Sequence, residues 1–321
     1  MFRAASTTFL AALALLAAPI MAAEWRYTDG AGKTVVLPDP PQRIIAHSTV
    51  AAALIPYGIR PVGILRDGPP SLDRSLDGVD ISGIPIVSRG WFEIDAEAVL
   101  NLDPDLIITE YSLAEGVYQG GTHEDAIARR LETIAPIVGV PRSNSIAGLL
   151  EDYRVFAQGL GADMDRPDLT ADKARLESAV TDLQATLATK PGLTVMAVSP
   201  SSQSLSIALP DLFGELHDLR QWGIDLLSPP SSSGTSYLTL SWESAQDYQA
   251  DIILLDDRWA QPAIDVFAAH PLGDRFIAIQ AGQVGNWPAE WIRSYAVYAN
   301  EIEGLTALIA RSNPDLVDES R

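Results

Sequence analysis

The 321-residue chain contains no cysteine, only three lysines and only four histidines. Without cysteine there is no disulfide, no thiolate metal site, no cysteine nucleophile and no lipid-modified cysteine that could tether an exported protein to a membrane. The histidines show no metal-ligand spacing, so direct capture of a bare metal ion is not expected; they are His47, His123, His217 and His270. Gly-x-Ser-x-Gly and His-Glu-x-x-His motifs are also missing. We therefore expect no catalytic residues, no protein metal site and no resident cofactor.

Basic residues are outnumbered throughout, with 22 Lys and Arg against 42 Asp and Glu and a formal net charge of −20. Such an acidic surface disfavours nucleic acid and anionic lipid as partners. It is compatible with docking on a basic protein, although general solubility explains it as well.

The one long apolar run lies at the N-terminus. Arg3 precedes apolar residues 9–20, and Ala22-Ala23 stands before Glu24. A positive start, a short apolar core and small residues at the end predict a signal peptide over residues 1–23, cleaved near Ala22 or Ala23. No second run of about 18 apolar residues follows, so the exported chain is expected to be soluble. An export signal without a lipid-anchoring cysteine favours the periplasm, with simple secretion as the alternative.

Beyond residue 24 the chain alternates short apolar runs with amphipathic stretches. Asp29-Gly30-Ala31-Gly32 marks a hairpin turn between residues 25–27 and 34–37. Strands are predicted at 43–46, 62–65, 85–87, 106–109, 137–140, 194–199, 204–208, 252–257 and 276–279. Helices are predicted at 48–58, 95–101, 124–133, 146–160, 211–222 and 288–312. This alternation is typical of an α/β fold with mainly parallel sheets covered on both faces.

One segment interrupts the alternation. Leucine and valine recur at spacings of four, three and four between Leu176 and Leu187, with charged residues on the other faces. The pattern predicts a long amphipathic helix that stops at Pro191-Gly192. The chain is thus divided into an N-terminal lobe (24–166), an inter-lobe helix (167–190) and a C-terminal lobe (191–321).

A capped-helix pattern occurs twice, 146 positions apart. Each copy has a helix cap, a glutamate two residues later, an aspartate eight residues after that, and then an apolar strand. The copies are Asp95, Glu97 and Asp105 in the first lobe, and Ser241, Glu243 and Asp251 in the second. The repetition indicates duplicated lobes, each presenting an exposed glutamate.

The order of these features resembles the helical-backbone substrate-binding proteins of ABC importers for ferric siderophores, haem and cobalamin. The resemblance covers residues 25–312. It is carried by Pro-Gln-Arg-Ile-Ile at 41–45, Asp-Leu-Ile-Ile at 105–108, His-Pro-Leu at 270–272 and Ala-Gly-Gln-Val at 281–284. It implies two Rossmann-like lobes joined by one long rigid helix, with a ligand cleft between them. Residues 271–295 look most like the ferric-hydroxamate-binding members of the family.

The resemblance also implies a partner. In this family a surface glutamate on each lobe contacts arginines of the ABC permease at the inner membrane, and these positions match Glu97 and Glu243. One carboxylate per lobe gives two-point electrostatic docking, which sets orientation and speeds encounter. An acid in the first turn also stabilises its own helix, so both roles are expected. The protein is expected to act as a monomer.

Candidate ligand residues combine arginine with aromatic side chains. Arginine suits chelate oxygens, aromatic rings suit flat apolar faces, and strand ends are where open α/β sheets bind ligands. Hydroxamate binders carry an arginine where Arg89 stands and a tyrosine close to Tyr111. The candidates are Arg89, Trp91, Tyr111, Tyr237, Arg258, Trp259, Trp287, Trp291 and Arg293. A ferric hydroxamate is favoured as ligand; cobalamin, haem and, from a different class, an exported enzyme are the alternatives.

Overall fold

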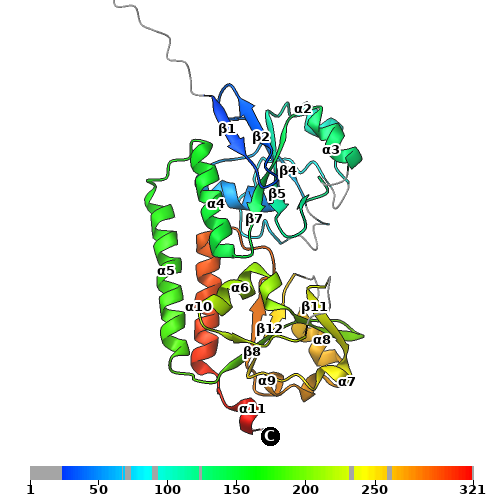
Figure 1. Ribbon diagram of the computed structural model, residues 1–321, viewed down its shortest axis with the longest axis vertical. Helices are drawn as coiled ribbons and strands as arrows, with labels where there is room; N and C mark the ends of the chain where they lie inside the picture. The colour runs from blue at the N-terminus through cyan, green and yellow to red at the C-terminus, as the bar shows by residue number, and fades with distance from the viewer. Residues whose placement is uncertain are drawn as a thin grey trace, which may run out of the picture.

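The computed structural model describes residues 24–66, 68, 74–88, 93–122, 125–230, 235–258 and 262–319. Two α/β lobes are stacked along the long axis of the molecule, and two long helices run along one side of it (Figure 1). The predicted α/β fold with two lobes and a long connecting helix is therefore confirmed. The predicted signal peptide, residues 1–23, lies outside the described residues.

The N-terminal lobe holds a five-stranded sheet in the order β4 (Gly63–Leu65), β3 (Ile44–His47), β5 (Leu106–Ser112) and β6 (Val117–Tyr118), with β7 (Ile137–Arg142) also pairing with β5. All of these pairings are parallel except that of β5 with β6. The expected hairpin is present as β1 (Trp25–Thr28) and β2 (Thr34–Leu37). The helical elements are α1 (Ser48–Leu54), η1 (Ile55–Tyr57), α2 (Ala96–Asn101), α3 (Asp125–Glu132) and α4 (Ile146–Gly159).

The C-terminal lobe holds a six-stranded sheet in the order β11 (Tyr237–Ser241), β9 (Ser204–Ala208), β8 (Thr194–Pro200), β12 (Ile252–Asp256) and β13 (Val284–Trp287), with β10 (Asp225–Leu226) pairing with β8. Its helical elements are η2 (Pro210–Leu212), α6 (Gly214–Gln221), α7 (Trp242–Ala245), α8 (Ala263–Ala269), η3 (Gly273–Arg275), α9 (Ile277–Gln280) and α11 (Leu316–Glu319). Trp242 belongs to the core of this lobe, with 1% of its surface exposed.

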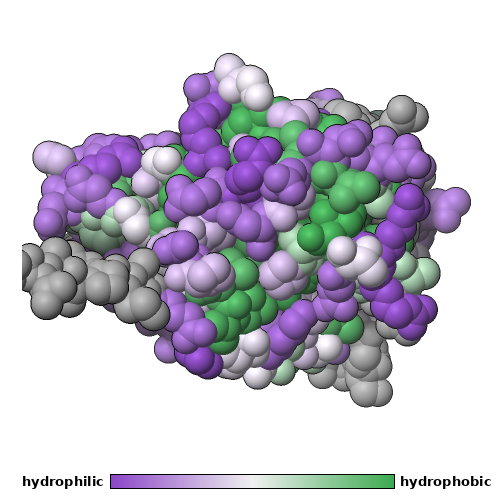
Figure 2. Space-filling model, turned by 90° about the horizontal axis from the view of Figure 1, so that it is seen from above, coloured by the Kyte–Doolittle hydropathy of each residue, from purple (hydrophilic) through white to green (hydrophobic). Residues whose placement is uncertain are grey.

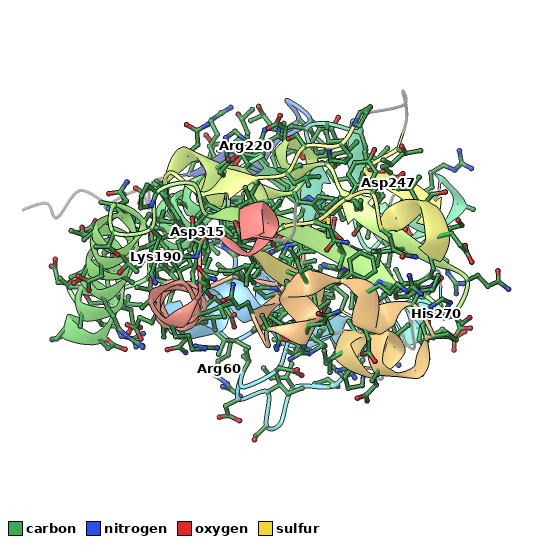
Figure 3. The ribbon with its side chains drawn as sticks, turned by 90° about the horizontal axis from the view of Figure 1, so that it is seen from below. Arg60, Lys190, Arg220, Asp247, His270 and Asp315 are labelled. Atoms are coloured by element: carbon green, nitrogen blue, oxygen red, sulfur yellow. The ribbon has the colours of Figure 1, made fainter. Side chains whose placement is uncertain are left out.

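The lobes are connected along one side by α5 (Pro167–Leu187), which packs beside α10 (Tyr295–Arg311) (Figure 1). Leu176, Ala179 and Leu183 form the buried stripe of α5, and Val180 and Leu187 of the predicted pattern are half-buried beside it. At the foot of the pair, the Lys190 ammonium donates to the Ser312 carbonyl at 2.7 Å. Figure 3 shows Lys190 and Asp315 near this end of the molecule.

The repeated pattern has the same structural role in both lobes. The caps accept as predicted: Asp95 from the backbone N–H of Glu97 and Ala98, and Ser241 from that of Ser244. The aspartate that follows then holds a neighbouring strand. Asp105 accepts from the backbone N–H of Gln42 and Arg43 ahead of β3, and Asp251 accepts from that of Thr194 at the start of β8. The repeat thus ties a capped helix to the first sheet strand of each lobe.

Two predicted strands were wrong. Residues 85–87 make only an isolated bridge, between Ile86 and Ile64. Residues 276–279 lie mostly in helix α9, and the last strand is instead β13. A short apolar run cannot separate a strand from a buried helical turn by its periodicity alone, which explains the second error. The final helix begins at Tyr295, capped by Ser294, later than the predicted start at residue 288.

No helix in the described part of the chain is long and apolar enough to cross a membrane. Seen from above, hydrophilic residues spread over the N-terminal-lobe end of the molecule, and apolar residues form separate small patches (Figure 2).

Candidate functional site

A cavity of about 60 Å³ lies between the lobes. Its walls include Ser112 and Arg142, which end β5 and β7 of the N-terminal lobe, and Phe213, Glu215 and Glu290 of the C-terminal lobe. The carboxyl ends of parallel strands are where open α/β sheets bind ligands. The cavity lies where the resemblance implied a ligand cleft between the lobes, and cleft here means this cavity together with the side chains that adjoin Glu290 at its edge.

A buried ion pair crosses the cleft floor. Arg293, just ahead of α10, donates from Nε and Nη2 to the Glu110 carboxylate of β5 at 2.6 and 2.9 Å, and each side chain is 2% exposed. The Tyr153 hydroxyl of α4 also donates to Glu110, at 2.6 Å. Burial by itself would raise the pKa of Glu110, but the Arg293 guanidinium outweighs it and lowers this pKa to about 2. Arg293 therefore joins the lobes with a permanent charge pair.

A second arginine is held at the end of β12. Arg258 donates to the Asp256 carboxylate at 2.7 Å, to Glu290 at 2.8 Å and to the Tyr237 hydroxyl at 2.5 Å. Its guanidinium also lies 6.0 Å from the centroid of the Trp287 ring. Burial would lower the pKa of Arg258, but Asp256 outweighs it, so the guanidinium stays charged. The predicted Tyr237 and Arg258 thus form one cluster.

A third contact joins the lobes beside this cluster. The Arg74 guanidinium pairs with Asp257 at 3.0 Å and lies 4.8 Å above the ring of Trp291. The indole N–H of Trp291 donates to Asp257 at 3.0 Å. The predicted Trp291 is therefore oriented by an arginine of the opposite lobe, a cation–π arrangement that holds an aromatic ring in place.

The other sequence candidates are distributed differently. Tyr111 is half-buried within β5 and packs edge-to-face on Tyr118 at 5.2 Å. Trp287 belongs to β13 and is 1% exposed, so in this structure it packs under the cleft and offers no surface to a ligand. Arg89, Trp91 and Trp259 lie outside the described residues.

Four cleft residues were missed in the sequence. Arg142 ends a strand, so the rule that selected Tyr111 and Arg258 would also have found it. Glu215, Glu290 and Arg74 carry no such signal. Glu290, for example, sits at φ 68°, and its backbone N–H donates to Glu215 Oε1 at 2.6 Å. Only the folded chain brings these acids beside the arginines.

Glu215 is a buried acid at the base of the cavity. Oε2 of Glu215 has no hydrogen-bond partner among the described residues, and the side chain is 3% exposed. Burial, with the nearby Glu290 carboxylate adding to it, raises the pKa of Glu215 to about 7. The folded protein therefore retains a proton on Glu215 that the unfolded chain releases near pH 4.5.

This retained proton predicts a pH-dependent stability. Between about pH 4.5 and about 7 the folded state binds more protons than the unfolded state, so stability falls as the pH rises through this window. Glu215→Gln removes the term, worth on the order of 3 kcal/mol when fully developed. Measured by urea unfolding, the unfolding free energy of the variant should rise relative to that of wild type as the pH increases from about 5 to about 8. The exposed control Glu303→Gln should show no such gain, and equal pH profiles for all three proteins would contradict the assignment.

A larger hollow lies away from the cavity between the lobes. It measures about 890 Å³ and is lined by α4, α5, the ends of η1 and α6 and the start of α10, on the long-helix side of the molecule. Its charged rim is paired along single helices, Glu151 with Arg154 and Lys173 with Glu177. No group of three or more potential metal-ligating side chains occurs among the described residues.

The two repeated glutamates, Glu97 and Glu243, are exposed at the starts of α2 and α7. Both helices lie on the side of the molecule opposite α5 and α10 (Figure 1). Seen from below, Asp247 and His270, which neighbour α7, also lie far from the long helices (Figure 3). The pKa of Glu243 is lowered by its own backbone N–H and by the Ser241 hydroxyl, which keeps the carboxylate ionised.

Solved structures share this architecture. The ferric-siderophore receptor DesE of Streptomyces coelicolor is 26% identical, with a TM-score of 0.79 over 90% of this chain and 99% of that one. The siderophore-binding protein of the fuscachelin gene cluster of Thermobifida fusca is 21% identical (TM-score 0.65, 84% and 97% covered). FhuD of Vibrio cholerae, solved with Fe³⁺-Desferal, is 19% identical (TM-score 0.61, 84% and 98% covered).

Among curated protein sequences no match was found. The sequence profile of the periplasmic binding protein family, in contrast, matches residues 84–291, which is more than half of the chain. The matched region runs from ahead of α2 through both walls of the cleft to Trp291. The chain therefore belongs to the periplasmic binding protein family.

Proposed function

We propose that this chain is the solute-binding component of an ABC import system, and that it captures a hydroxamate-type ferric siderophore between its lobes. It delivers this ligand to the inner-membrane permease. The signal peptide at residues 1–23 directs the chain to the periplasm, where it works as a monomer. It is not an enzyme and holds no resident cofactor, since iron arrives only as part of the chelate.

The observation that carries this proposal is the composition of the cleft. Tyr237 and Trp291 supply aromatic surface next to the guanidinium groups of Arg258 and Arg74. Flat apolar faces and exposed metal-bound oxygens are the two surfaces that a ferric chelate presents. Aromatic rings suit the former, and arginine N–H groups suit the latter. Arg89, Trp91 and Trp259 remain candidates for the same ligand.

Charge favours the hydroxamate class. Three arginines of the cleft already have carboxylate partners. Arg258 pairs with Asp256 and Glu290. Arg293 pairs with Glu110, and Arg74 with Asp257. The described cleft therefore has little positive charge in excess. A ferric trihydroxamate core is neutral, because its three hydroxamates balance Fe(III), whereas a ferric tris-catecholate carries three negative charges. A neutral core enters a charge-balanced cleft with the smaller desolvation penalty.

Similar proteins support a ferric siderophore as the ligand. DesE is a ferric-siderophore receptor at 26% identity, and FhuD of Vibrio cholerae binds Fe³⁺-Desferal, a ferric hydroxamate, within the same fold. The exposed Glu97 and Glu243, on the side away from the long helices, support docking on a basic permease surface.

Titration of the purified mature chain tests the proposal. Because Trp291 directly follows Glu290, which lines the cavity, ferric desferrioxamine B should quench tryptophan fluorescence with submicromolar affinity. The panel should include a ferric tris-catecholate, haemin and cyanocobalamin, with metal-free desferrioxamine B as control. Tight binding of haemin or cyanocobalamin together with no response to any siderophore would refute the ligand assignment. Turnover of an added ligand in place of stoichiometric binding would refute the binding-protein role.

A further inference from the structure

Glu290 occupies an unusual position in the cleft wall. It is one of two non-glycine residues with positive φ in the described chain, at 68°, and lies between the end of β13 and the start of α10. Its backbone N–H is held by the buried Glu215 carboxylate at 2.6 Å. A non-glycine residue in this conformation is uncommon and persists where its surroundings hold it in place. The backbone of Glu290 is therefore fixed, and so is the point from which its side chain extends.

From this fixed backbone position the Glu290 carboxylate reaches arginines of both lobes. Oε2 accepts from Arg258 Nη1 at 2.8 Å, and Oε1 lies 3.9 Å from Nη2 of Arg142, which ends β7 in the opposite lobe. The Glu290 side chain is 41% exposed, against 29% for Arg142 and 23% for Arg258. An accessible negative charge thus lies between the two arginines at the cavity.

Arg258 has a second carboxylate partner besides Glu290. Arg258 is also bound by Asp256, whose side chain is fully buried, so its charge is balanced without Glu290. Glu290 consequently adds negative charge where an incoming ligand would approach both arginines. An anionic ligand group must compete with a tethered carboxylate for the same N–H donors, and it leaves that carboxylate without its partner.

We propose that Glu290 selects ligands by charge, so that the cleft accepts neutral and cationic ferric chelates and discriminates against anionic ones. This inference rests on the proposed function and narrows its ligand class. Glu290 acts through its charge on Arg258 and Arg142 and need not touch the iron-binding core. The selection therefore acts on groups at the periphery of the chelate.

Three ferric complexes with one common core test the selection. Desferrioxamine B carries a pendant amine, its N-acetyl derivative is neutral there, and its N-succinyl derivative carries a carboxylate. Wild type should bind the amine and acetyl complexes more tightly than the succinyl complex. Glu290→Gln keeps the size and one oxygen acceptor but removes the charge. It should strengthen binding of the succinyl complex about tenfold and change binding of the acetyl complex little.

A matched control is available on α10. Glu303 also binds an arginine, Arg175, at similar exposure (45%) but away from the cleft. Glu303→Gln should leave the order of the three affinities unchanged. Arg142→Gln should have the opposite effect on binding of the succinyl complex. It removes a positive charge near the Glu290 carboxylate, so discrimination against the succinyl complex should increase. It also tests the inference independently of whether Glu290→Gln folds.

The outcomes separate the two proposals. If Glu290→Gln shifts all three affinities by the same factor, or Arg142→Gln shifts only the overall affinity, charge selection by Glu290 is overturned and the hydroxamate function stands. If none of the three complexes binds wild type or either variant, the proposed function is overturned and the selection with it. A gain for the succinyl complex that shrinks at high ionic strength supports the inference, since salt screens charges at this exposure.

Discussion

The Arg293→Ala variant is expected to unfold at a much lower urea concentration than wild type, with a loss of about 3–5 kcal/mol in unfolding free energy. The variant leaves the Glu110 carboxylate, 2% exposed, without the guanidinium that neutralises it. The Tyr153 hydroxyl still donates to it, but a neutral donor compensates a buried charge only in part. Because the pair joins β5 to the segment ahead of α10, its loss also loosens the contact between the lobes.

The exposed ion pair of Arg175 and Glu303 shows how much stability is lost when the same kind of pair is broken at the surface. Arg175 binds Glu303 with similar geometry, but both side chains are more than 40% exposed. Arg175→Ala should therefore lower the unfolding free energy far less than Arg293→Ala does. The double variant Glu110→Leu/Arg293→Met should recover most of the stability, since replacing both buried charges removes the uncompensated one. Equal losses for Arg293→Ala and Arg175→Ala would show that the buried pair has no special weight.

Acid titration gives the same pair a second test. The Glu110 pKa is about 2 in the folded protein, against a usual value of 4.5. The ionised pair thus stabilises the fold above pH 4.5, and this contribution disappears as the pH falls toward 2. The Glu110→Leu/Arg293→Met protein should lack this part of the acid unfolding.

Import by cells producing Glu97→Arg/Glu243→Arg as their only copy should fall to background, while ligand binding by the purified variant stays within about twofold of wild type. The substitutions place positive charge on both glutamates that we propose meet permease arginines, so attraction becomes repulsion at two points. They leave the cleft unchanged, because both residues start exposed helices away from its lining.

Uptake of labelled ferric desferrioxamine B, paired with fluorescence titration, separates the two effects. The control Glu177→Arg/Asp182→Arg makes the same charge change on exposed positions of α5, the opposite side of the molecule, and should import normally. If the Glu97/Glu243 variant lost ligand binding, the docking surface and the cleft would both be misplaced. If it imported normally, the docking role would be wrong.

Local patterns in the sequence predicted the architecture well. The caps at Asp95 and Ser241, the turn at 29–32 and the apolar stripe of α5 each depend on residues a few positions apart, and each is present in the structure. The errors arose where local information is ambiguous. The apolar run at 276–279 fits a strand or a buried helical turn equally well, and only its packing decided for the helix.

The site was less predictable because its chemistry depends on partners distant in sequence. Arg293, predicted as a ligand arginine, lines the cavity, and its partner Glu110, 183 positions away, also makes it a buried link between the lobes. Trp287 looked like a cleft aromatic until the strand β13 formed and buried it. Glu290 was invisible in the sequence, since its significance comes from a fixed backbone conformation and from arginines of two lobes.

The sequence alone predicts two α/β lobes, a long connecting helix and a glutamate at the start of one helix in each lobe. These features follow from caps, turns and periodicity, which act within a few residues. Only the folded chain shows which charges are paired, which aromatic rings are buried and which acid faces the cleft. Burial and long-range pairing set those properties, and both exist only once the two lobes pack against each other.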